Sequence, residues 1–271
     1  MLRSMYSGVS GMRGFQTKLD VIGNNIANVN TVGFKAGRVM FKDIMSQTMS
    51  GVTAPVEGES GGVNAKQVGL GVSVASIDTL HTAGSAMTTG VQTDLRIDGD
   101  GFFVVSPGAD GPNYLTRAGN FILDANRQLV NADGMFVRSV DGDIITLEAE
   151  VKAFSISQTG EIISIDAEGL STATGVFVGV AVVSNPSGLE KVGGNLYRMT
   201  PNADAEELVI GTAGDPETGA GAIVTGQLEM SNVDLTNEFT EMIVAQRGFQ
   251  ANSRIITTSD EILQEVVNLK R

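Results

Sequence analysis

The sequence of 271 residues contains no cysteine, no tryptophan and only one histidine. Without cysteine, neither a disulfide framework nor a thiolate metal site can form. Any catalytic site that depends on imidazole would have to use His81, and no nucleophile motif lies near it. We therefore expect no enzyme, no cofactor and no bound metal, and we expect His81 to make an ordinary polar contact.

Long apolar runs are also missing. No stretch of 18 apolar residues occurs, so the sequence predicts no membrane-spanning helix and no membrane insertion. The first residues lack a compact apolar segment followed by a cleavage site, so they do not resemble a secretory signal peptide. Taken alone, these features indicate a cytoplasmic protein.

Basic residues are scarce, with 18 Lys and Arg against 31 Asp and Glu and a net charge of −13. The excess negative charge lies in residues 43–225, whereas the first 42 residues are net positive and residues 226–271 are mildly acidic. An acidic middle segment repels nucleic acid, so we expect no nucleic-acid partner. The opposite charges of the two ends predict that they attract each other.

Both ends of the chain show the periodicity of amphipathic helices. The carboxyl-terminal stripe has heptad spacing and consists of Leu235, Met242, Phe249, Ile256 and Leu263, widened by Phe239, Ile243, Ile262, Val266 and Val267. The amino-terminal stripe consists of Leu2, Met5, Val9, Met12, Phe15, Leu19, Ile22, Ile26 and Val29. Asp234 is a candidate N-cap, and Lys270 and Arg271 place positive charge at the opposite end of that helix. A single helix cannot bury such a stripe, so we expect each to pack lengthwise against other helices.

The middle of the chain shows short strand patterns separated by Gly, Asn and Asp, which predict a mainly antiparallel β domain. The expected strands lie at residues 72–77, 102–105, 114–121, 128–130, 135–137, 144–147, 151–156, 161–165, 176–184 and 196–199. Residues 98–101 are predicted to be a turn, because Arg96 stands where a calcium loop needs an acidic ligand. Residues 34–48 are expected to form a short helix or an extended connector, and the glycine-rich residues 50–71 an irregular loop.

The sequence thus predicts an α+β fold in three parts. Residues 1–30 and 232–271 form a coiled-coil-like helical domain, residues 31–75 a connector with the glycine-rich loop, and residues 76–231 a β-rich domain.

Four segments resemble the signatures of bacterial flagellar axial proteins, the rod and hook family. DVIGNNIANVNTVGFK (20–35) resembles the amino-terminal signature, and SNVDLTNEFTEMIVAQRGFQANSRII (231–256) resembles the carboxyl-terminal one. IDGDGFFVV (97–105) and YLTRAGNF (114–121) resemble the core of the family's β domain. The first two segments occur at the expected ends and in the expected order.

The resemblance is nearest to short hook proteins of Gram-positive type and implies a structural role. Copies of the chain would polymerise into a curved helical tube that transmits torque from the basal body to the filament, with the terminal helices inside and the β domain outside. The resemblance also implies export through the flagellar type III apparatus without cleavage, and hence an extracellular place in the hook or basal body. Implied partners are further copies of the chain, rod proteins, hook–filament junction proteins, the hook cap and the export apparatus. The expected subunit-interface residues are Leu2, Met5, Val9, Met12, Phe15, Leu19, Ile22, Ile26, Leu235, Phe239, Met242, Phe249, Ile256, Leu263 and Val267, with Asn24, Asn25 and Asn28 as polar contacts.

Two alternatives stay open. The first is the distal rod, a straight drive shaft, because an added stretch such as residues 50–71 is also a feature of distal rod proteins. The second is a soluble β-type binding module with helical arms, which the 5% aromatic content and the lack of tryptophan disfavour.

Overall fold

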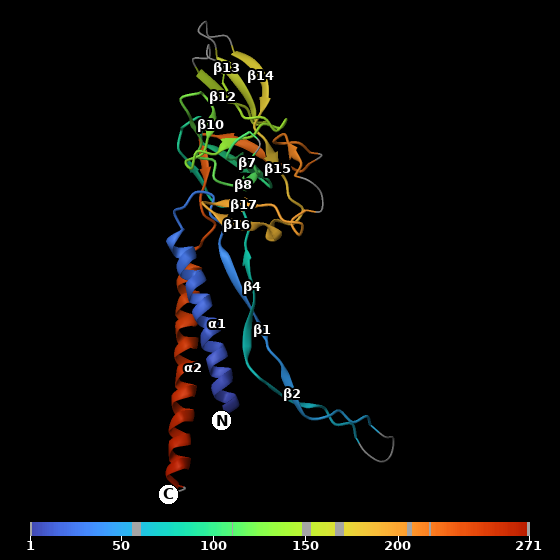
Figure 1. Ribbon diagram of the computed structural model, residues 1–271, viewed down its shortest axis with the longest axis vertical. Coiled ribbons are helices and arrows are strands. Elements are labelled where there is room, and N and C mark those ends of the chain that lie inside the picture. The colour runs from blue at the N-terminus through green and yellow to red at the C-terminus, as the bar shows by residue number, and fades with distance from the viewer. Residues whose placement is uncertain are drawn as a thin grey trace. The chain divides into compact units, whose positions relative to one another are not determined.

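The computed structural model describes residues 2–55, 61–109, 111–147, 153–165, 171–204, 208–216 and 218–269. These residues form two compact units (Figure 1). Unit 1 contains the chain up to Ala27, Gly37–Thr79 and the chain from Asp234 onward, and unit 2 contains Asn28–Ala36 and Leu80–Val233. The two helices and the antiparallel strands confirm the predicted α+β fold. The segment predicted as a connector, residues 31–75, is divided between the two units.

Two long helices dominate unit 1. Helix α1 (Leu2–Ala27) lies side by side with helix α2 (Leu235–Leu269) in Figure 1, and the two run in opposite directions. Asp234 caps α2 as predicted, because its Oδ1 accepts a hydrogen bond from the backbone N of Thr236 at 2.9 Å. The basic pair Lys270 and Arg271 lies outside the described residues.

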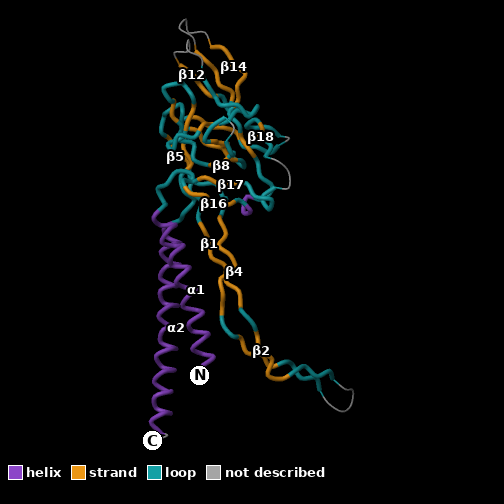
Figure 2. Tube along the Cα trace, viewed as in Figure 1, coloured by secondary structure: helices purple, strands orange, loops and turns teal. Residues whose placement is uncertain are grey.

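The rest of unit 1 is a two-stranded ribbon, which we define as residues 37–79. Strand β1 (Gly37–Asp43) pairs with β4 (Val72–Thr79), and β2 (Ser46–Ser50) pairs with β3 (Lys66–Gly69), both antiparallel. Figure 2 shows the β1–β4 pair leading into the shorter β2–β3 pair. Of the irregular loop expected at residues 50–71, the described part is wrong at the strands, which take Ser50 and Lys66–Gly69, and it contains an isolated bridge between Thr53 and Val63. Each side of the ribbon supplies backbone hydrogen-bond partners for the other.

Unit 2 contains the β domain, and its paired strands are antiparallel. Its largest sheet has the order β16–β17–β8–β7–β11–β10–β9, and β15 joins β7 to β18. The strands of this sheet are β16 (Glu190–Gly193), β17 (Leu196–Arg198), β8 (Tyr114–Thr116), β7 (Phe102–Ser106), β11 (Phe136–Val137), β10 (Leu129–Val130), β9 (Ile122–Leu123), β15 (Val180–Ala181) and β18 (Ile210–Gly211). A three-stranded sheet consists of β12 (Ala153–Ile156), β13 (Glu161–Ile165) and β14 (Ser171–Phe177). Two further pairs join β19 (Ala222–Thr225) to β6 (Leu95–Asp98) and β20 (Gln227–Glu229) to β5 (Ala86–Thr88). A short 3-10 helix, η1, spans Pro186–Gly188.

Most of the expected strands are present, although several are shorter than predicted. Residues 144–147 contribute only isolated bridges, between Ile144 and Arg138 and between Thr146 and Gln128. Residues 98–101 form the predicted turn between β6 and β7, where Gly99 and Gly101 have φ values of 124° and 125°.

Strand β7 lies at the centre of unit 2, and all five of its residues are buried. Because side chains alternate across a sheet, Phe103 and Val105 enter one apolar cluster while Phe102 and Val104 enter another. Phe103 also packs edge-on against Phe121, with ring centroids 5.2 Å apart. The run of four apolar residues at 102–105 therefore supplies both faces of the core.

A buried ion network joins distant segments of unit 2. Glu229 Oε1 accepts from Lys35 Nζ at 2.5 Å, and its Oε2 accepts from Arg117 Nη1 at 3.3 Å. The backbone N of Gly84 donates to the same carboxylate at 3.0 Å. Burial lowers the pKa of Lys35, and the hydrogen bond to Glu229 opposes that shift. Two cations and one anion are thus held together out of water.

His81 lies beside this network in an apolar contact, so the expected ordinary polar contact is wrong. Its ring packs edge-on against Phe102 and Tyr197, with centroid distances of 5.6 Å and 5.3 Å. Within the described part of the chain, neither ring nitrogen has a hydrogen-bond partner. Burial, reinforced by the positive charges of Lys35, Arg117 and Lys191, lowers the pKa of His81 to about 4.

Candidate subunit interface

The two helices of unit 1 are held together by polar contacts near one end. Lys18 forms an ion pair with Glu241, and Asn25 Nδ2 donates to Glu238 Oε1 at 3.0 Å. Towards the other end, α1 approaches α2 near Asn252. Residue numbers therefore rise along α1 in the direction in which they fall along α2, so the two helices are antiparallel.

Two glycines allow the two helices to approach each other closely. A Cβ atom added at Gly248 would lie 2.6 Å from Cζ of Phe15, and one added at Gly11 would lie 2.6 Å from Nδ2 of Asn252. The absence of a side chain at both positions lets the ring and the amide fit against the opposite backbone. The apolar spacing of the two helices gives no sign of this role.

Helix α2 presents more apolar surface than α1 covers. Of its described side chains only Ala245 and Ser259 are buried. Ile243 and Val267 are 60% and 64% exposed. The exposed large apolar residues of α2 are Leu235, Phe239, Ile243, Val244, Phe249, Ile255, Ile262, Val266, Val267 and Leu269. They lie on both sides of the stripe that faces α1, so one partner helix leaves two flanks uncovered.

The structure divides the predicted interface residues into three groups. Ile22 and Asn25 are buried within the chain. Met5, Val9, Met12, Phe15, Leu19, Ile26, Met242, Ile256 and Leu263 are half-buried. Leu235, Phe239, Phe249 and Val267 are exposed, as is Asn24. Asn28 belongs to unit 2, where its side-chain oxygen lies 3.1 Å from the Thr31 hydroxyl, and the side chain of Leu2 lies outside the described part.

Asn25 and Glu238 form the most buried polar contact of the helix pair. Asn25 is 1% exposed and also bonds the backbone of Gly37 through both its side-chain atoms. Burial raises the pKa of Glu238, while the hydrogen bond from Asn25 acts in the opposite direction.

The ribbon adds a second apolar surface, which the sequence analysis missed. Its base packs on α1, where the rings of Phe41 and Phe15 lie 6.0 Å apart. Further out, Met45, Met49 and Val52 are between 66% and 71% exposed. Scattered apolar residues on a surface are ordinary, but a long two-stranded ribbon with several of them resembles a contact surface.

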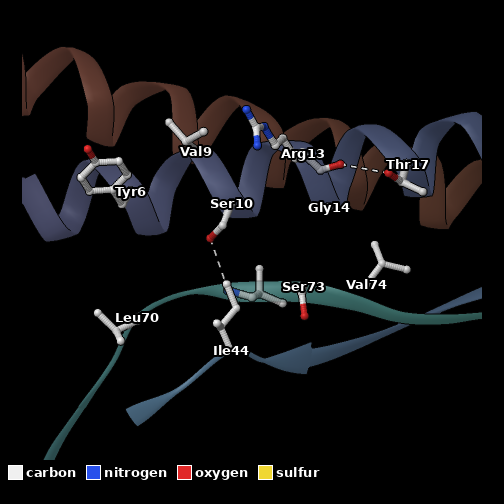
Figure 3. Close-up of a pocket in the computed structure, with 11 residues that line it drawn as sticks. Tyr6, Val9, Ser10, Arg13, Gly14, Thr17, Ile44, Leu70, Ser73 and Val74 are labelled. Atoms are coloured by element: carbon white, nitrogen blue, oxygen red, sulfur yellow. Dashed lines mark hydrogen bonds between the residues drawn. The ribbon is translucent and has the colours of Figure 1, made fainter. Parts of the chain in front are cut away.

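A groove of about 470 Å³ lies between α1 and the ribbon. Figure 3 shows α1 along one side and the ribbon strands along the other, with Ile44 and Leu70 on the ribbon side. Ser10 closes its floor, because its Oγ accepts a hydrogen bond from the backbone N of Val72 at 3.3 Å. Of the described residues that line it, Arg13 is the one that carries a charge.

Within the described ranges no group of three or more His, Asp or Glu residues is placed to hold a metal ion. No described helix combines the length and apolarity needed to cross a membrane.

Three family models match the chain, each in the position that the fold suggests. The model described as "Flagella basal body rod protein" matches residues 5–35, which cover most of α1. "Flagellar hook protein FlgE/F/G D1 domain" matches residues 96–164 in the β domain, and "Flagellar basal body rod FlgEFG protein C-terminal" matches residues 224–269.

Whole relatives match as well. The flagellar basal-body rod protein FlgG of Bacillus subtilis is 55% identical over 272 residues, with both chains covered completely. FlgG of Borreliella burgdorferi is 35% identical over 273 residues, again with full coverage of both. The flagellar hook protein FlgE of Borreliella burgdorferi is 30% identical, but over 449 aligned positions.

Two packed terminal helices with a β unit inserted between them define a structural α+β protein. The chain belongs to the family of flagellar basal-body rod and hook proteins. It is therefore a structural protein of the bacterial flagellum, and the matched models and relatives describe rod and hook proteins rather than catalytic ones.

Proposed function

We propose that this protein is a rod subunit of the flagellar basal body, with no enzymatic activity, and that it works by polymerising with copies of itself. The observation that carries the proposal is the exposed apolar surface of α2. Burying ten large side chains would contribute on the order of 15–30 kcal/mol before the entropy of association is subtracted. Such a surface is stable in water only when neighbours cover it.

The comparisons support the rod better than the hook that the sequence resemblance favoured. The alignment with FlgG of Bacillus subtilis spans 272 residues, almost the length of this chain, at 55% identity. The alignment with the Borreliella burgdorferi hook protein spans 449 positions at 30% identity, so well over a hundred of those positions have no counterpart here.

Within the polymer, we propose that unit 1 forms the inner layer and unit 2 the outer layer. The subunit interface then includes the exposed residues Leu235, Phe239, Phe249 and Val267, together with the half-buried positions of both stripes. Identical subunits would meet through two different surfaces, and such heterologous contacts extend into a helix instead of closing. Rod, hook and export-apparatus proteins are the partners proposed for the ends of this polymer.

Electron microscopy of the purified full-length chain, concentrated until it assembles, tests the proposal. We expect straight, stiff tubes. The variant compared with it replaces Phe239 and Ile243 with Ser, which removes exposed apolar area from α2 without changing a buried residue. We expect this variant to keep its helical circular dichroism and to lose assembly.

Other outcomes contradict particular parts of the proposal. Curved or supercoiled tubes would favour the hook. A chain that stays monomeric at every concentration, with folded helices, would favour the binding module. Tubes formed equally well by the double Ser variant would show that α2 does not carry the interface.

A further inference from the structure

We propose that the groove between α1 and the ribbon receives the carboxyl-terminal end of α2 from a second copy of this chain. The inference deepens the proposed polymer, on which it rests, by naming one contact between neighbouring subunits. Its elements are a groove with one positive charge, and a helix end with an apolar stripe and negative charge.

The last turns of α2 extend past α1. Gly8 of α1 lies beside Ile256 of α2, and α1 begins only six residues before Gly8. Residues 264–269 are all exposed and reach ~9 Å beyond the level of Leu263, at ~1.5 Å per residue. Figure 1 shows this end of α2 continuing past the amino end of α1.

The extended end carries an apolar stripe. Ile262, Val266 and Leu269 are spaced by four and three residues, so they lie on one side of the helix. All three are exposed, and Leu269 is 86% exposed. A helix with this spacing of apolar residues is the usual occupant of an elongated apolar groove.

The groove offers matching chemistry. Ile44 and Leu70 of the ribbon and Val9 of α1 supply apolar walls. Arg13 on α1 is exposed and forms no ion pair with another described residue, and Figure 3 shows it among the residues that line the groove. The volume of the groove, about 470 Å³, falls in the range of sites that take several side chains at once.

The charges of the two surfaces are opposite. Residues 2–19 of α1 contain three basic residues and no acidic one, whereas residues 255–269 of α2, which precede Lys270 and Arg271, contain Asp260, Glu261 and Glu265 and no basic one. Glu265 adjoins Val266 at the edge of the apolar stripe, while Asp260 lies on the other side of the helix, at ~100° per residue. Glu265 is therefore the carboxylate placed to reach Arg13 of a neighbour.

The same contact cannot form within one chain. Ile44 lies at the level of Gly71 and Ser10, because its backbone N bonds Gly71 O and Ser10 bonds Val72. Val266 lies ten residues beyond Ile256, which is ~15 Å further along the helix axis. A disulfide requires Cα atoms no more than about 7 Å apart, so a link between positions 44 and 266 must join two chains.

The absence of cysteine makes a direct test possible. Chains with Ile44→Cys are mixed with chains with Val266→Cys, assembled and oxidised, and the products are separated by gel and sequenced by peptide mass spectrometry. We expect a dimer linked from residue 44 of one chain to residue 266 of the other. The control mixture uses Gln246→Cys, an exposed polar position of the same helix outside the proposed interface, and we expect at least about tenfold less of that link.

A charge exchange provides the second test if the cysteine chains do not assemble. Arg13→Glu and Glu265→Lys should each raise the concentration needed for assembly roughly tenfold, and the double variant should restore it to within about threefold. Arg13→Glu combined with Asp260→Lys is the matched control and should not be restored.

The outcomes separate this inference from the proposed function. Tubes without the 44–266 link, a control link of equal yield, or rescue by Asp260→Lys as good as by Glu265→Lys would overturn the groove contact and leave the polymer intact. A wild-type chain that never assembles would overturn both.

Discussion

The side chain of Asn25 binds the backbone of Gly37 as a strand neighbour would. Its Nδ2 donates to Gly37 O at 2.8 Å, and its Oδ1 accepts from Gly37 N at 3.0 Å. One amide thus satisfies both polar groups of the first residue of β1 and ties the end of α1 to the start of the ribbon. A buried amide with these partners fixes the angle at which the chain leaves the helix.

We predict that Asn25→Ala destabilises unit 1. It removes the buried amide that bonds the half-buried backbone of Gly37 and the Glu238 carboxylate, which costs about 2–3 kcal/mol. Urea unfolding followed by helical circular dichroism measures the loss. Asn268→Ala, at an exposed position of α2, is the control and should change stability by less than about 0.5 kcal/mol. Equal effects of the two changes would contradict a special role for Asn25.

A second prediction concerns the buried carboxylate of unit 2. Glu229→Gln keeps the shape of the side chain but leaves Lys35 and Arg117 buried without their anion, so we expect a loss of about 3–5 kcal/mol. Glu190→Gln is the matched control, since Glu190 pairs with Arg198 at the surface, where side chains are more than half exposed and a pair contributes about 0–1 kcal/mol. Denaturant unfolding followed by tyrosine fluorescence compares the two. A Glu229→Gln loss no larger than that of the control would disprove the ion network as a stabilising element.

Acid should weaken unit 2 through His81. Its pKa is about 4 in the folded protein and 6.5 as the ordinary value, so the unfolded chain takes up the proton first as the pH falls. The contribution of neutral His81 to the free energy of unfolding is complete above pH 6.5 and is lost progressively between pH 6.5 and pH 4. Thermal unfolding across this range measures the slope, and His81→Phe, which keeps an aromatic ring against Phe102, should flatten it. An identical slope in the two proteins would assign the acid sensitivity to carboxylates.

Two glycines of the helix pair should respond in opposite directions to the same change. Gly248→Ala places a methyl group against the ring of Phe15 and should destabilise unit 1 by about 1–3 kcal/mol. Gly23→Ala adds a methyl group that meets no described atom within 4 Å and should stabilise α1 by up to about 1 kcal/mol. Thermal melting of each variant gives the sign. If Gly248→Ala also stabilised, the close packing of α1 on α2 would be wrong.

The helices and most strands could be predicted because their signals are local. The heptad spacing and the cap at Asp234 locate α2, and the apolar run at 102–105 locates the central strand. Of the ribbon, only the alternation at residues 72–77 gave such a local signal. Its strands are mostly exposed, so no buried apolar face marks them, and their pairing depends on residues far along the chain, such as Gly37 with Thr79.

The buried ion network was missed for a similar reason. Lys35, Arg117 and Glu229 each look like ordinary surface charges in sequence, and Glu229 lies 194 residues from Lys35. The groove depends on α1 and on two ribbon strands at once. The antiparallel stagger that leaves the end of α2 free also cannot be read from either helix alone, because it is set by contacts such as Gly11 with Asn252.

The distance along the chain between Lys35 and Glu229 has a consequence for the order in which the protein can fold. A chain that emerges from a ribosome or from any narrow passage with its amino end first presents Lys35 and Arg117 long before their shared carboxylate arrives. Both α1 and the ion network must wait for the last fifth of the molecule, since their partners lie in α2 and at Glu229. Folding therefore acts as a check on completeness, in which a truncated chain stays open and only a finished one closes.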